Sequence, residues 1–332
     1  MDLDEIGEFG LLEKIRRKIR QRSNHVKLGL GDDCAVVASS DRDLLTSTDI
    51  LIENVHFDLK YFSPEMIGKK AIAVNLSDIA AMGGRPLYIL ISLGIPSSTP
   101  VEFVEKLYIG FETMAKKYGC SIVGGDISKS INGLIVSITI IGEIKKNASI
   151  KRSGAKNKDL IFVTGNLGDS AAGLESLKRY HYPKKNIAIR KHLCPIPRLE
   201  EGQILAEKVG VSSMIDLSDG LASDLRRLCE ESNCGARIYL DKIPLSSRLK
   251  KLEKSGNRKV IDYSLYGGED YELLFTIKRS KIKGLQKSWQ KMKTAITNVG
   301  EILDKKHGIT MVLPDGKEKL LSKTGYNHFK KN

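Results

Sequence analysis

Carboxylate side chains beside glycines and apolar segments recur along this chain. The pattern occurs at residues 31–33, 47–49, 78, 125–126, 216–220 and 268–270. A carboxylate next to a buried segment is costly unless a cation meets it. Two like charges about 4 Å apart repel by roughly 4 kcal/mol at an effective dielectric constant of about 20. If the fold brings these acids together, we therefore expect divalent cations between them.

The donor types indicate which cation and which chemistry to expect. Carboxylate and hydroxyl oxygens select Mg²⁺ or Ca²⁺ over Zn²⁺. Mg²⁺ held by few carboxylates and completed by phosphates is the usual arrangement at sites of phosphoryl transfer. The alternative is that each acid belongs to a separate surface turn, since Asp and Gly are common turn residues. Six such turns beside buried segments, in a chain with excess Lys and Arg, favour the metal site.

The sequence lacks the common motifs that hold phosphates or activate nucleophiles. It contains no GxxxxGK[ST] loop, no HRD and DFG pair, no HExxH and no GxSxG. We therefore expect phosphates to be held by metal ions and by glycine backbone N–H groups, without a P-loop lysine.

The segment 71–86, AIAVNLSDIAAMGGRP, is expected to position Asp78. Its Ala, Leu, Ile and Met residues favour a helix, which the glycines at 83 and 84 and Pro86 would end. Residues 71–74 are contiguous apolar residues, so this part is expected to be buried on all sides. The alternative for Asp78 is pairing with a nearby Lys or Arg, or capping of a turn.

The other expected elements of the first half alternate strands and helices. The spacing predicts helices at 9–22 and 101–117 and strands at 43–50, 87–96 and 134–144, with a further strand from 120 that ends before Asp126. Ser47, Thr48 and Asp49 are expected where a strand ends. After residue 144 the charge rises and the apolar pattern stops, which indicates a domain boundary.

The second half is expected to continue as an α/β domain. Residues 159–177 and 214–232 each read as strand, turn and helix, with Ser218 and Asp219 in the N-cap position of the second helix. Further strands are expected at 236–240, after the acids at 269–270, at 299–303 and at 309–313, with a helix at 282–292. Because ligands gather at strand ends in α/β layers, we expect the acids to converge there.

Composition bounds the class of protein. Of the 332 residues, 41% are hydrophobic and 28% are charged, which allows an ordinary soluble core. No run approaches 18 uncharged apolar residues, and MDLDEIGEFG lacks the regions of a signal peptide, so neither a membrane span nor secretion is expected. The five Cys include no CxxC pair, and we expect reduced thiols in a cytoplasmic protein.

The formal net charge of +14, from 54 basic and 40 acidic residues, leaves a nucleic-acid-binding protein as an alternative of a different class. Such a protein would bind tightly, with an affinity that falls steeply with salt. The basic residues are scattered, however, and few aromatics lie among them. Solvated helix faces and loops explain them better, and the acid clusters argue against nucleic acid as a partner.

Long ordered motifs resemble one known family. They are FGLLEKI, GLGDDCAVV, TSTDILIENVHF, AVNLSDIAAMGGRP, IVGGDIS, RSGAKNKD, VTGNLGDSAAGL, MIDLSDGLASDL, GGEDYELLF and the terminal GYNHF. Together they cover nearly the whole chain and resemble the thiamine-monophosphate kinases, of the superfamily that includes aminoimidazole ribonucleotide synthetase and selenophosphate synthetase.

The resemblance implies a fold, a reaction and partners. The fold would be the two-domain α/β (α+β) fold of aminoimidazole ribonucleotide synthetase, with an N-terminal ATP- and Mg²⁺-binding domain at 1–145 and a C-terminal α/β domain at 146–332. The N-terminal β-sheet domain would pair across a homodimer, with ATP near the seam. The reaction would be ATP- and Mg²⁺-dependent phosphorylation of thiamine monophosphate by direct in-line transfer, with no membrane or nucleic-acid partner.

The resemblance also implies roles for individual residues. The metal ligands would be Asp33, Ser47, Thr48, Asp49, Asp78, Asp126, Asp216 and Asp219, of which Asp78, Asp126 and Asp216 would be catalytic. The ATP contacts would be Tyr108, Gly125, Asp126, Arg152 and Ser218. The thiamine contacts would be His56, Glu269 and Tyr326. Without the resemblance, we would expect His56 to be an ordinary half-buried histidine, Arg152 a charged linker residue and Tyr108 a core residue of a helix.

Another ATP-using enzyme of the same superfamily remains the alternative within enzymes. A selenophosphate synthetase would carry a reactive Cys in a flexible Gly-rich segment near its N-terminus. Cys34 follows the GDD segment, but an apolar run follows it and that Gly-rich pattern is absent.

Overall fold

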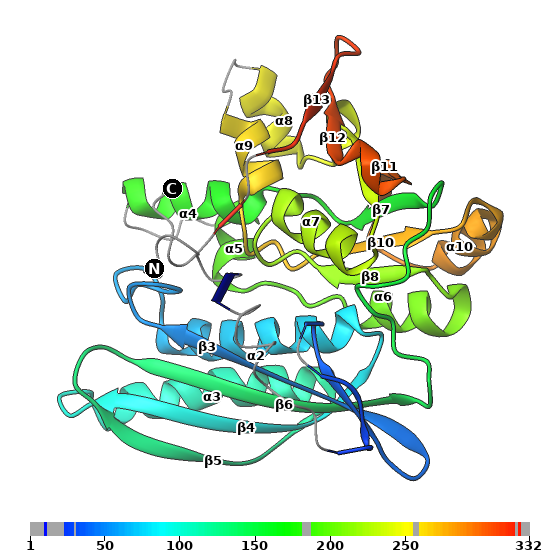
Figure 1. Cartoon of the computed structure of the whole chain (residues 1–332). Helices are drawn as coiled ribbons and strands as arrows, with labels where there is room; N and C mark the ends of the chain where they lie inside the picture. Colours follow the sequence, from blue (N-terminus) through cyan, green and yellow to red (C-terminus); the bar gives the residue numbers. More distant parts are fainter. Residues whose placement is uncertain are drawn as a thin grey trace.

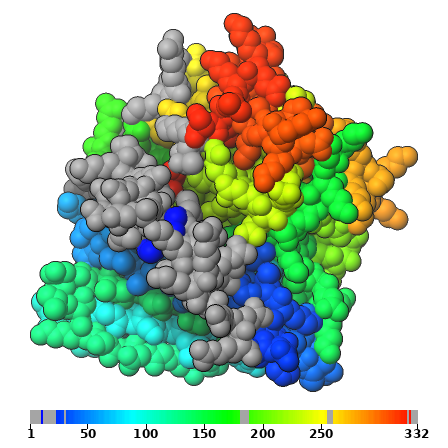
Figure 2. Space-filling model, viewed as in Figure 1, coloured from blue at the N-terminus to red at the C-terminus, as the bar shows by residue number. Residues whose placement is uncertain are grey.

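Two β-sheets, each with helices packed on it, divide the chain near residue 145 (Figure 1). The computed structural model describes residues 10–11, 23–29, 31–180, 187–254, 259–322 and 325–326. The helix expected at 9–22 and the end of the GYNHF motif lie outside these ranges, apart from residues 10, 11, 325 and 326. Figure 2 shows the first domain, from blue to cyan, below the second domain, from green to red.

Within the described residues, the first sheet has six strands in the order β1-β2-β3-β6-β4-β5. β4 and β5 are parallel and the other neighbours are antiparallel. The strands are Val26–Leu28, Ala35–Ala38, Arg42–Ile52, Arg85–Pro96, Ser121–Ser130 and Ile135–Lys145, numbered β1, β2, β3, β4, β5 and β6 in chain order. In β4 and β6 every second residue is buried, so one face of the sheet packs on the core.

Strand β3 is longer than the sequence pattern predicts. Ser47, Thr48 and Asp49 lie inside it, because all eleven of its residues pair with β6. Successive side chains of a strand point to opposite faces. Ser47 and Asp49 therefore face the helices, and Thr48 faces the other way. The expectation that all three stand together at a strand end is wrong.

The open face of the first sheet carries large apolar side chains. Residues directly opposite each other on paired strands share a face, which puts Ile50, Ser92 and Asp126 in one row across the sheet. Ile50 is 50% exposed and Tyr88 of β4 is 47% exposed. Asp126 lies within β5 instead of after it, so the expected strand end before this residue is also wrong.

In the part of the chain that the structure describes, the second sheet has seven strands in the order β13-β12-β9-β11-β7-β10-β8. Only β9 and β12 are parallel among its described strands. The strands are Leu160–Thr164, Ser213–Asp216, Gly235–Tyr239, Leu273–Ile277, Ile296–Leu303, Ile309–Val312 and Glu318–Leu320, numbered β7 to β13 in chain order. These elements confirm the strands expected in the second half, although the sheet is mostly antiparallel.

Helices cover one face of the first sheet and pack around the second (Figure 1). Those of the first domain are α2 (Pro64–Ala81) and α3 (Val101–Tyr118). Those of the second are α4 (Asp169–Tyr180), α5 (Ile187–Leu193), α6 (Leu199–Ile204), α7 (Leu221–Glu231), α8 (Ser247–Lys254), α9 (Lys259–Tyr266) and α10 (Ile282–Trp289), with a π-helical segment at Leu205–Val209. None of the described helices is long and apolar enough to cross a membrane.

Helix α2 is shared by the two domains. It begins after Ser63, whose hydroxyl accepts the N–H of Met66, and it is followed by Gly83 in the left-handed region. Its residues are buried on nearly every side, as expected, because the first sheet lies on one side and the second domain on the other. A Cβ added at Gly202 of α6 would lie 2.1 Å from the carbonyl oxygen of Ala80, so the two backbones touch.

Candidate active site

A cavity of about 540 Å³ lies between the two domains. The first domain lines it with β3, α2 and the segment after β3, and the second with the end of β8, the start of α4 and the segment 268–271. The predicted site residues that line it are Asp33, Ser47, Asp49, His56, Asp78, Arg152, Asp216, Ser218, Asp219, Glu269 and Tyr326. The fold thus brings most of the predicted site together.

Three carboxylates meet in this cavity although they come from distant parts of the chain. One oxygen atom from each of Asp33, Asp78 and Asp216 lies within 4.8 Å of the other two. Ser47 Oγ donates to Asp78 Oδ2 at 2.5 Å, and Ser77 Oγ donates to Asp216 Oδ2 at 2.7 Å. The hydroxyls therefore fix the direction of two of the three carboxylates.

The neighbouring cations do not neutralise this acid cluster. Burial, followed by the charges of Asp49, Asp216 and Asp33, raises the pKa of Asp78 well above its usual value. Burial and the charge of Asp33 raise the pKa of Asp216 in the same way. Burial also raises the pKa of Asp49 to about 6. A divalent cation would relieve the repulsion, and the all-oxygen donor set fits Mg²⁺ or Ca²⁺.

Arg152 contacts the edge of this cluster. Its Nη2 donates to Asp33 Oδ1 at 2.8 Å and its Nε donates to Asp33 Oδ2 at 3.2 Å, so the guanidinium grips both oxygens. Its backbone N–H donates to Asp32 Oδ2 at 3.1 Å. Burial and the charge of Asp33 nevertheless raise the pKa of Asp32 to about 7. Arg152 is thus more than a linker charge, because it is bound to a predicted metal ligand at the cavity wall.

Ser218 and Asp219 lie in the loop between β8 and α7 and do not cap the helix. The N-cap residue is Gly220, and the carboxylate of Asp224 accepts the backbone N–H groups of Asp219 and Gly220 at 3.1 Å each. The expected N-cap role is wrong because the helix begins after Gly220, and Asp224 instead fixes the loop that carries Ser218 and Asp219. Arg227 Nη2 donates to Asp219 Oδ2 at 2.6 Å, so this acid is already paired with a cation.

Four predicted site residues do not line the cavity of the described chain. Thr48 and Asp126 lie on the open face of the first sheet, where Thr139 Oγ1 donates to Thr48 Oγ1 at 3.2 Å. Gly125 lies beside Asp126 in the edge strand β5. Tyr108 packs edge-on against another aromatic ring of α3 and lines a separate shallow groove. A single chain therefore does not bring these four residues to the acid cluster.

Glu269 lies at the cavity wall between two residues that the sequence analysis missed. Lys70 Nζ lies 2.7 Å from Glu269 Oε1, and His192 Nδ1 lies 3.0 Å from Glu269 Oε2. Burial raises the pKa of Glu269, but Lys70 and His192 lower it by more, so this carboxyl group is ionised. A signal for Lys70 was present, since a lysine directly precedes the contiguous apolar residues 71–74.

His56 and Tyr326 complete the wall near Glu269. His56 Nδ1 accepts the backbone N–H of Ile52 at 3.0 Å, and its carbonyl oxygen accepts from Lys70 at 3.0 Å. Tyr326 is 37% exposed, and its backbone N–H donates to a carbonyl of the loop before α7. Both predicted thiamine contacts therefore lie at the same cavity as the acids.

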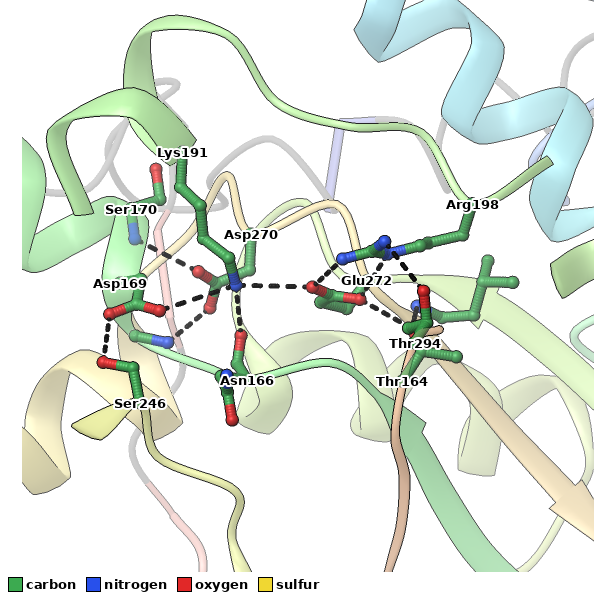
Figure 3. Close-up of polar contacts among 12 residues, drawn as sticks. Thr164, Asn166, Asp169, Ser170, Lys191, Arg198, Ser246, Asp270, Glu272 and Thr294 are labelled. Atoms are coloured by element: carbon green, nitrogen blue, oxygen red, sulfur yellow. Dashed lines mark hydrogen bonds and ion pairs between the residues drawn. The ribbon is translucent and has the colours of Figure 1, made fainter. Parts of the chain in front are cut away.

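A carboxylate occupies the glycine-rich turn before α4. Asp270 Oδ2 accepts the backbone N–H of Gly168 at 2.6 Å, and Asp270 Oδ1 accepts that of Ser170 at 3.2 Å (Figure 3). The sequence analysis expected glycine N–H groups to hold phosphate. The N–H of Gly168 is instead bound by a carboxyl group of the protein itself.

Two cationic side chains, Arg198 and Lys191, contact acids next to this turn. Arg198 donates to both oxygens of Glu272, at 2.6 and 2.7 Å, and Lys191 Nζ lies 3.3 Å from Glu272 and 3.6 Å from Asp169 (Figure 3). Lys191 also donates to the carbonyl oxygen of Asn166 at 2.8 Å. This network joins the turn before α4 to β10 and so fixes one side of the cavity.

Two family models match the chain. They are AIR synthase related protein, N-terminal domain, over residues 31–144, and AIR synthase related protein, C-terminal domain, over residues 156–312. The thiamine-monophosphate kinase of Bacillus subtilis (strain 168) is 37% identical over 331 residues, which cover 98% of this chain and 100% of that protein. The chain belongs to the thiamine-monophosphate kinases of the AIR synthase related family. The kinase of Aquifex aeolicus (strain VF5) is 40% identical over 279 residues, covering 83% of this chain and 87% of that protein.

Solved structures agree with membership of this kinase family. AaThiL complexed with AMPPCP and TMP is 37% identical, has a TM-score of 0.84 and covers 99% of each chain. Hydrogenase maturation protein HypE in complex with ATP is only 19% identical, with a TM-score of 0.71 over 86% of each chain, and therefore shows the fold alone. The resemblance and the fold class predicted from the sequence are confirmed.

Proposed function

We propose that this chain is a thiamine-monophosphate kinase, which transfers the γ-phosphoryl group of ATP to thiamine monophosphate and releases thiamine diphosphate and ADP. The observation that carries the proposal is the meeting of Asp33, Asp78 and Asp216 in a cavity that also holds Glu269. Two anions must approach each other in this reaction, and metal ions bound by carboxylates reduce their repulsion. The family relatives support this choice of substrates.

We infer that several Mg²⁺ ions bind at the acid cluster. The ligands from one chain would be Asp33, Ser47, Asp49, Asp78 and Asp216, with Asp219 available once Arg227 is displaced. Bound Mg²⁺ would neutralise and orient phosphate oxygens. The contribution of the chain itself is to hold its carboxylates in place through Ser47 and Ser77.

The remaining cavity residues are proposed to hold the two substrates. Arg152 and Ser218 would contact ATP, as the family motifs imply. His56, Glu269 and Tyr326 would contact the thiamine moiety, since a carboxylate suits an amino-bearing or cationic ring and an exposed tyrosine can stack on one. This places the phosphates at the acids and the rings at the wall near Glu269.

The acceptor must itself carry a phosphate for this site to work. A phosphate monoester is already largely anionic near neutral pH, because its second pKa is about 6. It needs charge neutralisation and in-line placement more than it needs a general base. Thiamine offers a neutral hydroxyl, which binds metal poorly and keeps its proton. We therefore propose that thiamine is phosphorylated at least roughly a thousandfold less well.

We also propose a homodimer that forms through the open face of the first sheet. A large exposed apolar patch on a folded protein usually marks an interaction site. Ile50, Tyr88 and Leu90 are 50%, 47% and 36% exposed on this face. Pairing there would place Thr48 and Asp126 at the seam, where the family likeness puts ATP. The proposed partners are thus ATP, thiamine monophosphate and a second copy of this chain. The proposed location is the cytoplasm.

The test is an assay of purified protein with ATP and Mg²⁺, and with thiamine monophosphate, thiamine or no acceptor. Products are separated by chromatography. Thiamine diphosphate formed only from the monophosphate supports the proposal. Comparable use of thiamine would contradict the metal-held acceptor, and no use of either would point to another ATP-using enzyme of the superfamily.

A further inference from the structure

Lys70 is the largest fully buried side chain among the described residues, with a relative exposure of 1%. A charged ammonium is expensive to bury unless it is paired and hydrogen-bonded. Here the Nζ lies 2.7 Å from Glu269 Oε1, donates to the carbonyl oxygen of His56 at 3.0 Å, and stands 5.3 Å from the centre of the Phe62 ring. Lys70, His56 and Glu269 all line the cavity, so the ion pair and the hydrogen bond lie at its wall.

His192 approaches the same carboxylate from the second domain. Its side chain is 3% exposed, its Nδ1 lies 3.0 Å from Glu269 Oε2, and its ring packs edge-on against Phe62 at 5.8 Å. Ser170 Oγ lies 3.2 Å from the same Nδ1. Burial and then the charge of Lys70 lower the pKa of His192, so the ring near neutral pH is neutral and donates through Nδ1–H.

The backbone at Glu269 is held in a conformation that few residues adopt. Glu269 has φ of 65° and Tyr271 has φ of 49°, both in the left-handed region that costs a non-glycine residue energy. The N–H of Glu269 donates to the carbonyl of Ser218 at 2.7 Å, and that of Tyr271 donates to Leu217 at 2.9 Å. Strain of this kind persists only where surrounding contacts fix it, and it gathers at functional sites.

The two buried donors leave part of the carboxylate available to a ligand. A carboxylate offers about four lone-pair positions. Lys70 and His192 each contact one oxygen, and the side chain of Glu269, which lines the cavity, remains 24% exposed. Its negative charge is balanced by Lys70, so an N–H donor on a ligand is favoured over a bare cation. The Glu269 carboxylate therefore offers a ligand a hydrogen-bond acceptor whose position is fixed.

We propose that Lys70 and His192 are positioning residues for the acceptor, and that they act by fixing the Glu269 carboxylate so that it accepts a hydrogen bond from the amino-bearing ring of the substrate. This inference rests on the proposed kinase function. Lys70 comes from α2 and His192 from α5, so recognition of the ring depends on contacts from both domains. A purely structural ion pair between the domains would use the same atoms but would not distinguish the two substrates.

The test compares the Michaelis constants for thiamine monophosphate and for ATP in Lys70→Met. We expect the KM for thiamine monophosphate to rise at least about tenfold, because the acceptor of one ligand hydrogen bond is no longer held. The KM for ATP should change less than about threefold. The matched control is Lys69→Met, next to it on α2, which does not line the cavity. An equal rise of both constants, or no rise, would overturn the inference.

Two further comparisons keep the inference testable if Lys70→Met folds poorly. His192→Leu should raise the KM for thiamine monophosphate. His192→Asn keeps a donor near the Nδ1 position, so its KM for thiamine monophosphate should lie close to the wild-type value. In a Glu269→Gln background, Lys70→Met should add less than about twofold, since residues that act through one group are not additive. Full additivity, or failure of Asn to restore binding, would overturn the positioning role.

The assay of the wild-type protein distinguishes failure of this inference from failure of the proposed function on which it rests. Wild-type protein that neither turns over thiamine monophosphate nor is stabilised by it against thermal unfolding would overturn the proposed function and the inference together. Wild-type turnover with an unchanged acceptor KM in Lys70→Met and His192→Leu would overturn the inference alone.

Discussion

Ser47 and Thr48 are neighbours in sequence but lie on opposite faces of strand β3. Ser47 donates to Asp78 in the cavity, whereas Thr48 lies on the open face of the sheet and meets Thr139. One strand therefore serves two sites. The inner face holds the acid cluster, and the outer face carries the apolar patch through which we propose that two copies pair.

Loss of the Ser47 hydroxyl should weaken binding of Mg²⁺. Ser47→Ala removes the hydrogen bond that directs the Asp78 carboxylate, and a hydrogen bond of this kind contributes about 1 kcal/mol or more. We expect the Mg²⁺ concentration for half-maximal activity to rise about fivefold, measured by titration of Mg²⁺ at fixed ATP. Thr113→Ala on α3 is the matched control, and equal shifts in the two variants would contradict the assignment.

Asp78→Asn and Asp126→Asn should both lower turnover at least roughly a hundredfold, because removal of one preorganised charge at a phosphoryl-transfer site typically lowers the rate by that factor. Their stabilities should differ. Asp78 is half-buried among other acids, so its substitution should raise the melting temperature in the presence of a chelator. Asp126 is exposed, and its substitution should leave the melting temperature nearly unchanged. Near wild-type turnover in either variant would remove that residue from the proposed site.

A charge on the open face of the first sheet should separate the proposed dimer. Leu90→Asp places a carboxylate in the middle of the apolar patch, where burial against a second copy would be costly. Sedimentation at micromolar concentration should show a species of twice 36.8 kDa for the wild type and of 36.8 kDa for the variant. Ile131→Asp, at a residue that is 90% exposed, is the control. A wild type that sediments only at 36.8 kDa would refute the dimer.

Asp270 should make stability fall as pH rises. Burial raises the pKa of Asp270 from 3.8 to about 7, so between pH 4 and 7 the folded chain keeps a proton that the unfolded chain loses. The free energy of unfolding therefore decreases through this window, by at most about 1.4 kcal/mol per pH unit from this group. In Asp270→Asn, thermal unfolding in chelator should show a shallower decrease from pH 5 to 7. Asp262→Asn on α9 is the exposed control, and identical slopes for all three proteins would contradict the prediction.

The apolar pattern of the sequence predicted most of the strands. The contiguous apolar residues 71–74 predicted the buried helix α2, because a helix packed on both sides needs apolar residues on every face. It did not predict where β3 ends. Ser and Thr residues are compatible with both a strand and a turn, and only pairing with β6 settles that the strand continues past Asp49. The face of each side chain followed from that pairing.

Convergence of the acids was predicted for a reason that proved incomplete. Strand ends gather ligands in parallel α/β sheets. Here both sheets are mostly antiparallel, and Asp78 lies in the last turn of helix α2 while Asp49 lies inside strand β3. Asp216 alone among these three ends a strand. The pairing of Lys70 with Glu269 could not be found from spacing, because these residues meet only through the packing of one domain on the other. The contact of His192 with Glu269 likewise depends on how the second domain folds.

The close contacts at Gly83 and Gly202 hold the two walls of the cavity together although neither residue lines it. A Cβ at Gly83 would lie 2.4 Å from that of Ala206, and one at Gly202 would meet Ala80 at 2.1 Å, so α2 and the second domain are in direct contact along their main chains. Rotation of one domain against the other would break these contacts. A side chain at either glycine would therefore push α2 and the second domain apart and alter the cavity that they enclose.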